Sequence, residues 1–110
     1  MAVKAREFEQ LLLNSIDEAL LSLGESGRQS IYFHLDQNFD VKKELITKNL
    51  EQFQFGLEKI FGVGARFIEI LIMKNLYCKI NKPLNGENNI NLEFLKYVEN
   101  AKQSYVSNAQ

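Results

Sequence analysis

Apolar residues in the first forty positions recur at the three- and four-residue spacing that predicts amphipathic helices. Residues 3–23 form a first predicted helix, whose inner stripe contains Phe8, Leu12, Ile16, Leu20 and Leu23. Gly24 suits the end of this helix, because glycine adopts a positive φ without a Cβ penalty. A second helix is predicted to end near Asn38, and the spacing of Ser26 and Gln29 at its start is that of a capping box.

Three further elements are predicted along the rest of the chain. A third helix follows the connector DVKKELITK and starts near Thr47 or Asn49. Gly62 can close that helix, and a fourth helix then covers residues 65–81. A C-terminal helix is predicted over residues 91–106, after an asparagine-rich loop and with Asn91 as its cap.

The segment FIEILIMKNLYCKI, residues 67–80, is apolar on almost every side of a helix. At 100° per residue its apolar side chains fall into three groups. The groups are Phe67, Leu71 and Cys78; Ile68, Ile72 and Leu76; and Ile70, Met73, Tyr77 and Ile80. A helix on the surface needs only one apolar stripe. We therefore expect this helix to belong to the core on most sides and to meet another molecule on one side.

These elements predict a single all-α domain over residues 1–110, a compact bundle of about five helices with the apolar fourth helix at its centre. Thirteen Lys and Arg balance fourteen Asp and Glu, which gives a net charge of -1. That balance gives no global basic footprint for nucleic acid or for an anionic membrane. Glu69 and Lys74 interrupt the apolar segment, so no membrane span or membrane partner is expected.

The composition indicates a cytoplasmic protein without catalytic chemistry. Charged residues interrupt the N-terminal leucine run, so no signal peptide is expected. Cys78 is the only cysteine, fits a reducing compartment and is predicted to be a buried hydrophobe. His34 is the only histidine and lacks the additional ligands that a metal site requires. We expect no enzyme activity, no metal and no cofactor.

Two groups of cations are candidates for contacts with nucleic acid or another anion. Lys42, Lys43 and Lys48 make a small basic cluster in the connector, which Glu44 dilutes. Arg66 follows GVGA at the start of the fourth helix, where helix N-termini favour anions. A cation opposes the helix dipole at that end, so Arg66 is expected to pair with a carboxylate such as Glu69. We interpret GVGA as a structural corner and keep anion binding as the alternative.

A homodimer is the predicted assembly, because a symmetric pair covers surplus apolar surface with a second copy of itself. Phe33 and Phe55 support this prediction, since both lie off the inner stripe of their own helix. The candidate interface residues are Phe33, Phe55, Ile70, Met73 and Tyr77.

Two stretches of the chain resemble a known family. They are SIDEALLSLGESGRQSIYFHLDQNFDVKKELI and FGLEKIFGVGARFIEILIMKNLYCKI. The chain is similar there to the small archaeal Nitrosopumilus output domains, which occur alone or at the ends of signalling proteins. The resemblance covers residues 12–80 of a predicted core at 1–81, and leaves the C-terminal helix outside. Val63 and Thr47 stand where prolines are more usual in the family, which makes the connector and the corner less rigid.

The resemblance implies a regulatory output module with no active site to carry over. Our leading hypothesis is a homodimeric, non-catalytic signal-transduction module that acts through helix surfaces, with a further protein of the signalling system as a candidate partner. The alternative is a DNA-binding transcription regulator that uses two copies of the lysine connector. A small-molecule sensor is a third hypothesis, and it requires a pocket between helices.

Overall fold

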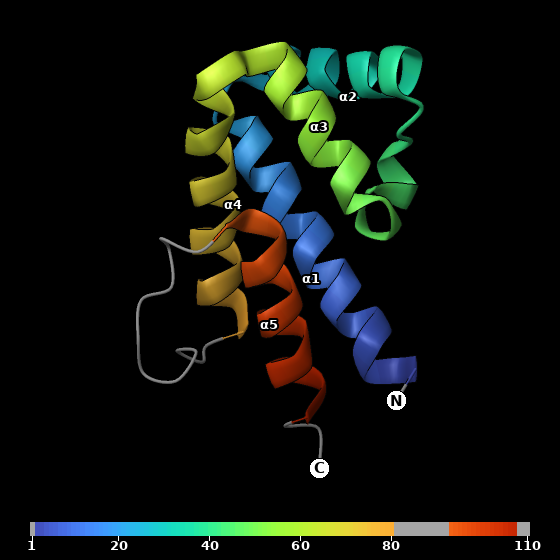
Figure 1. The fold of residues 1–110 in the computed structure, drawn as a ribbon, viewed down its shortest axis with the longest axis vertical. Coiled ribbons are helices and arrows are strands. Elements are labelled where there is room, and N and C mark those ends of the chain that lie inside the picture. The colour runs from blue at the N-terminus through green and yellow to red at the C-terminus, as the bar shows by residue number, and fades with distance from the viewer. Residues whose placement is uncertain (1, 81–92, 108–110) are drawn as a thin grey trace.

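The structure, a computed structural model, describes residues 2–80 and 93–107, where the chain forms helices joined by short turns. Figure 1 shows its α-helices, which are α1 (Ala2–Leu21), α2 (Glu25–Phe39), α3 (Leu50–Phe61), α4 (Ala65–Ile80) and α5 (Phe94–Ser107). Two 3₁₀ turns, η1 (Lys43–Lys48) and η2 (Gly62–Gly64), precede α3 and α4. The predicted all-α bundle of about five helices is confirmed. The predicted loop before the last helix and its cap Asn91 lie outside the described residues.

Gly62 ends α3 as the sequence predicts, whereas α1 already ends at Leu21 and Gly24 is the N-cap of α2. Gly24 has φ 93° and Gly62 has φ 60°, which are values that favour glycine. The predicted capping box at Ser26 is wrong, because α2 begins at Glu25 with Gly24 as its N-cap and no side-chain cap hydrogen bond. The predicted inner stripe of the first helix is one residue too long, because Leu23 lies beyond α1 and is exposed.

Helix α1 occupies the central position in the fold. It packs against α2, α4, α5 and η1, and its contact with α4 is the most extensive between any two described elements. In Figure 1 it crosses the molecule diagonally, with α2 lying across its C-terminal end. The buried side chains of its stripe are Phe8, Leu12, Ile16, Ala19 and Leu20. Each large apolar side chain buried in this way contributes about 1.5–3 kcal/mol on transfer grounds.

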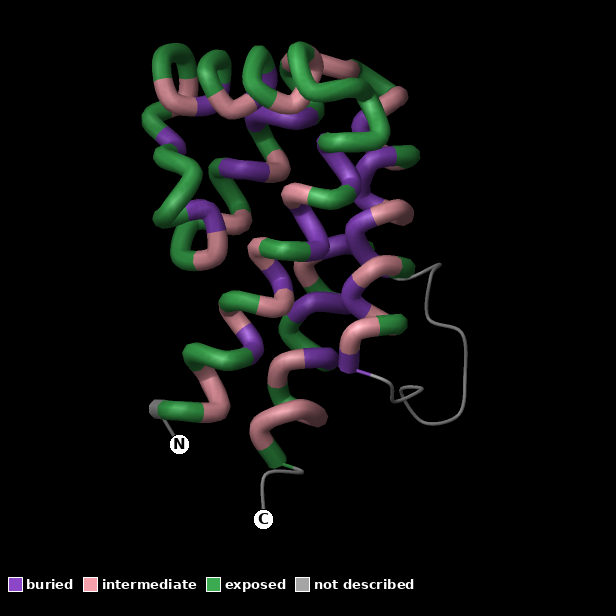
Figure 2. The backbone as a smooth tube through the Cα atoms, turned by 180° about the vertical axis from the view of Figure 1, so that it is seen from behind, coloured by how far each residue is buried: buried purple, intermediate pink, exposed green. Residues whose placement is uncertain are grey.

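Helix α4 is buried on the sides that face α1, α3 and α5, and exposed on its outer side. The buried set is Ala65, Ile68, Glu69, Ile72, Met73, Leu76 and Ile80. Figure 2 shows the exposed segments of α4 along the side that faces away from α1. The other described helices therefore enclose α4 on most sides and leave its outer side open, as the sequence predicts for a helix that belongs to the core on most sides.

Helix α2 approaches α3 closely at Gly56. A Cβ added at Gly56 would lie 2.6 Å from Cδ2 of Leu35 and 3.3 Å from Cδ2 of Phe39. Leu35 is completely buried, so it has little space into which to move. The absence of a side chain at Gly56 is what allows the two helices to approach.

Gly56→Val is expected to lower the free energy of unfolding by about 1–3 kcal/mol, because the added carbons overpack the contact with Leu35. Urea denaturation followed by circular dichroism measures the change. Gly27→Val is a milder comparison. A Cβ added at Gly27 would lie 3.0 Å from one neighbour, Cβ of Leu23. An unchanged midpoint for Gly56→Val would contradict a close α2–α3 contact.

Candidate interaction surfaces

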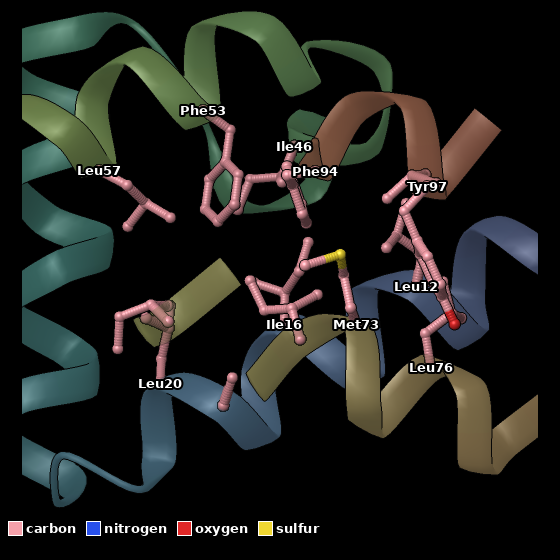
Figure 3. Close-up of a cluster of buried hydrophobic side chains, with 14 of the residues drawn as sticks. Leu12, Ile16, Leu20, Ile46, Phe53, Leu57, Met73, Leu76, Phe94 and Tyr97 are labelled. Atoms are coloured by element: carbon pink, nitrogen blue, oxygen red, sulfur yellow. The ribbon is translucent and has the colours of Figure 1, made fainter. Parts of the chain in front are cut away.

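Met73 is completely buried, so its predicted place at an interface is wrong. Figure 3 shows its side chain inside the apolar cluster, beside Ile16 of α1 and facing the side of α5 that carries Phe94. The spacing of 100° per residue placed Met73 in one group with Ile70 and Tyr77, and these two residues are only partly buried. The side of α4 chosen from the sequence is therefore the edge of the core.

Phe33 and Phe55 are exposed, as their positions off the inner stripes predict. Phe33 is 61% exposed on α2 and meets the ring of His34 edge-on. Phe55 is 46% exposed on α3, where the Phe39 ring and the Lys59 ammonium contact it. Within residues 2–80 and 93–107, no ring contact joins either phenylalanine to Tyr77 of α4. The predicted interface residues come from α2, α3 and α4, and one of them, Met73, is buried in the core.

The outward side of α4 carries a different set of residues, the outer α4 stripe: Phe67, Leu71, Lys74 and Cys78. Their spacing of three and four residues places them in one row along the helix. Phe67 is 76% exposed and Leu71 is partly buried, while Val63, just before α4, is 95% exposed. Cys78 is exposed as well, which corrects the prediction that it is buried.

A hollow of about 550 Å³, the corner hollow, adjoins the start of α4. Its lining residues are Glu58, Gly62, Val63, Ala65, Arg66 and Glu69. Nη1 of Arg66 lies 3.6 Å from Oε1 of Glu69, so the predicted pairing of Arg66 with a carboxylate is confirmed. Because the hollow holds two carboxylates and one guanidinium, its charge does not favour an anion at Arg66.

Glu69 is a buried carboxylate, only 4% exposed, in the middle of the α3–α4–α5 junction. Nε2 of Gln54 donates to Oε2 of Glu69 at 3.3 Å and to Oε2 of Glu93 at 3.0 Å. One amide of α3 therefore ties α4 to the residue that precedes α5. Oε1 of Glu93 also accepts the backbone N–H of Lys96, which caps α5.

The junction shifts the pKa values of Glu69 and Glu93 in opposite directions. Burial raises the pKa of Glu69, and the hydrogen bond from Gln54 and the charge of Arg66 only partly offset it. Burial alone would also raise the pKa of Glu93, but hydrogen bonds from Gln54 and from the N–H groups of Leu95 and Lys96 lower it below its usual value. The sequence identified Glu69 only as a partner for Arg66, and gave no signal for Gln54 or Glu93.

The three connector lysines each pair with a carboxylate of their own chain. Nζ of Lys42 is 3.1 Å from Asp36, Nζ of Lys43 is 3.7 Å from Asp17, and Nζ of Lys48 is 2.9 Å from Glu9. The hydrogen bond with Asp36 raises the pKa of Lys42. These charges are already balanced locally, which weakens the case for a phosphate-binding patch.

Asp17 ties α1 to α2 and to η1. Its carboxylate accepts hydrogen bonds from Nη1 of Arg28 at 2.9 Å and from the Tyr32 hydroxyl at 2.8 Å, and Lys43 lies over the Tyr32 ring. Burial and the hydrogen bond to Asp17 raise the pKa of Tyr32. The stretch that carries the family resemblance thus holds a structural junction here.

The described residues hold no group of three or more His, Cys, Asp or Glu side chains arranged to bind a metal ion. His34 is exposed and lies 3.3 Å from the Asn38 side-chain amide. In the same part of the chain, every helix is too short or too polar to cross a membrane. A separate hollow of about 330 Å³ lies among α1, α3 and α5, over Leu50 and Leu95.

No family model, curated protein sequence or solved structure matches the chain.

Glu69→Gln is expected to be at least as stable as the parent at pH 7, with the difference shrinking as pH falls. The raised pKa means that Glu69 contributes stability below its unfolded value of 4.5, and that this contribution is lost as pH rises through the folded value. Glutamine removes the buried charge and keeps an acceptor for Gln54. Urea denaturation at several pH values measures the difference.

Glu51→Gln is the control for this prediction, because Glu51 is exposed on α3 and is not among the groups that shift the pKa of Glu69. A Glu69→Gln protein that is clearly less stable than the parent at pH 7 would contradict the prediction, since the pair with Arg66 would then outweigh the burial of the charge.

Proposed function

We propose that this chain is a non-catalytic signal-output module that works as a homodimer through the outer side of α4. The observation that carries the proposal is the exposure of Val63 and Phe67, at 95% and 76%, the highest values among the large apolar side chains of residues 3–80 and 93–107. Water-exposed apolar groups one turn apart are typical of a contact surface rather than of a free monomer face.

The position of these residues supports a partner of the same kind. Phe67 and Leu71 lie on a regular helix whose opposite side is locked into the core by Ile72 and Met73. The surface is therefore rigid before it meets a partner, and association costs little ordering of the backbone. A twofold axis across one helix lets the same row of side chains cover itself.

The output role rests on the family resemblance and on the type of surface that the fold presents. The corner that carries EKIFGVGA, the most specific part of the resemblance, holds Val63 and leads directly into the outer α4 stripe. A module of this kind transmits a signal when it gains or loses a partner at that surface. The paired lysines of the connector do not favour the alternative of DNA binding.

Phe67→Glu is expected to convert the dimer into a folded monomer at micromolar concentration. The substitution places a charge in an apolar contact, where an unpaired ion is strongly unfavourable. In the monomer Phe67 is already exposed, so the helices and the thermal transition should be preserved. Light scattering gives the mass and circular dichroism gives the fold.

Two matched variants complete this experiment. Phe33→Glu adds the same charge to an exposed phenylalanine of α2 and should leave the dimer intact. Met73→Glu adds it to a fully buried position and should abolish the cooperative thermal transition. If Phe33→Glu dissociates the protein while Phe67→Glu does not, the interface lies on α2 and the proposal for α4 is refuted.

A further inference from the structure

The hollow of about 330 Å³ among α1, α3 and α5, the three-helix hollow, has an apolar lining. The apolar side chains that line it are Phe8, Leu12, Leu50, Leu95 and Val98. Phe8, Leu12 and Val98 are at most 4% exposed and belong to the packed core, while Leu50 and Leu95 are only partly buried. Spaces of this kind between the helices of a bundle, from about 300 Å³ upward, are typical small-molecule sites.

Three carboxylates line the hollow beside these apolar side chains. They belong to Glu9, Glu51 and Glu99, and Lys102 is the cation in the same lining. Oε2 of Glu9 lies 3.9 Å from Nζ of Lys102, and its Oε1 accepts a hydrogen bond from Nζ of Lys48 at 2.9 Å. Glu51 and Glu99 are exposed and make no hydrogen bond or ion pair within residues 2–80 and 93–107. Three carboxylates and two ammonium groups leave a net charge of -1.

The helix ends near the hollow do not reverse this charge. Leu50 opens α3 and Leu95 lies in the first turn of α5, and each helix N-terminus carries about half a positive elementary charge. At α5 the carboxylate of Glu93 offsets that charge, because its Oε1 accepts the backbone N–H of Lys96. At α3 the first-turn Glu51 is one of the carboxylates already counted. The hollow therefore stays negative.

We propose that the three-helix hollow binds a small organic monocation, a protonated amine or guanidine attached to an apolar body. The apolar body covers Leu50 and Leu95, and the cation lies beside the carboxylates of Glu51 and Glu99. A volume of about 330 Å³ is the share of about eleven water molecules in the liquid, which suits a ligand of about ten non-hydrogen atoms. This site goes beyond the proposed output function and includes no residue of the outer α4 stripe.

The lining distinguishes this ligand from three others. An organic anion would be repelled by Glu51 and Glu99, which have no cation of their own. A neutral apolar molecule would gain the contact with Leu50 and Leu95 but nothing from the two carboxylates. A metal ion would gain nothing from the apolar lining, and the described residues hold no group of side chains arranged to bind one.

Three ligands of equal chain length separate the contribution of charge from that of apolar contact: octylammonium, octanol and octanoate. NMR titration of the full chain at neutral pH and low ionic strength gives the dissociation constants and the residues whose amide signals move. Octylammonium is expected to bind about threefold to tenfold more tightly than octanol, since it adds two exposed ion pairs, and octanoate is expected to bind most weakly. The signals of Leu50 and Leu95 should move first.

Three results of this titration would overturn the proposal. The first is that octylammonium fails to bind. The second is that octanol binds as tightly as octylammonium, because the carboxylates would then contribute nothing. The third is that the shifted signals are confined to the outer α4 stripe, because the ligand would then occupy a different surface.

Variants of the lining test the sign of the charge in both directions. Glu51→Gln combined with Glu99→Gln should weaken octylammonium binding about fivefold and leave octanol binding unchanged. Lys102→Gln removes a cation from the lining and should strengthen octylammonium binding about twofold. Glu58→Gln makes the same change of charge near the other end of α3, outside the lining, and should leave both constants unchanged. Equal losses for octylammonium and octanol in the double variant would refute the ion contact.

The outcomes for this site and for the homodimer are independent. The three-helix hollow and the outer α4 stripe share no residue. A parent chain that is monomeric but binds octylammonium in the hollow would refute the proposed homodimer and support this site. A dimer that does not bind octylammonium would refute the site and leave the homodimer standing.

Discussion

The packing of α4 against α1 is the contact on which the rest of the structure depends. It joins residues about sixty positions apart and packs the buried side of α4 against the apolar stripe of α1. Helix α5 then covers the groove beside this pair with Phe94 and Tyr97, both almost completely buried. Because α1 holds α4 on one side only, the same contact also decides which side of α4 faces away from the core.

That consequence links the fold to the proposed function. Once Ile72, Met73 and Leu76 are directed toward α1, the 3.6-residue period of the helix directs Phe67, Leu71 and Lys74 outward. The glycine corner sets where this outward row begins, because Gly62 at φ 60° reverses the chain and places Glu58 beside the start of α4.

The sequence predicted the helices better than it predicted their neighbours. Gly24 and Gly62 mark helix ends by their own backbone chemistry, so these ends could be placed from local information. The outward side of α4 could not be identified from local information, because three sides of that helix are apolar. Only the positions of α1, α3 and α5 decide which of these sides is buried. The charges show the same limit. Lys48 pairs with Glu9 and Gln54 with Glu93, each across thirty-nine positions, and no local pattern identifies such partners.

The central claim is that the outer side of α4 joins two copies of this chain. Sedimentation equilibrium of the unaltered protein over a range of micromolar concentrations tests it most directly. The account predicts a reversible association that approaches twice the 12.7 kDa mass of one chain and goes no further, since a twofold contact is closed. A mass of 12.7 kDa throughout the range would contradict it.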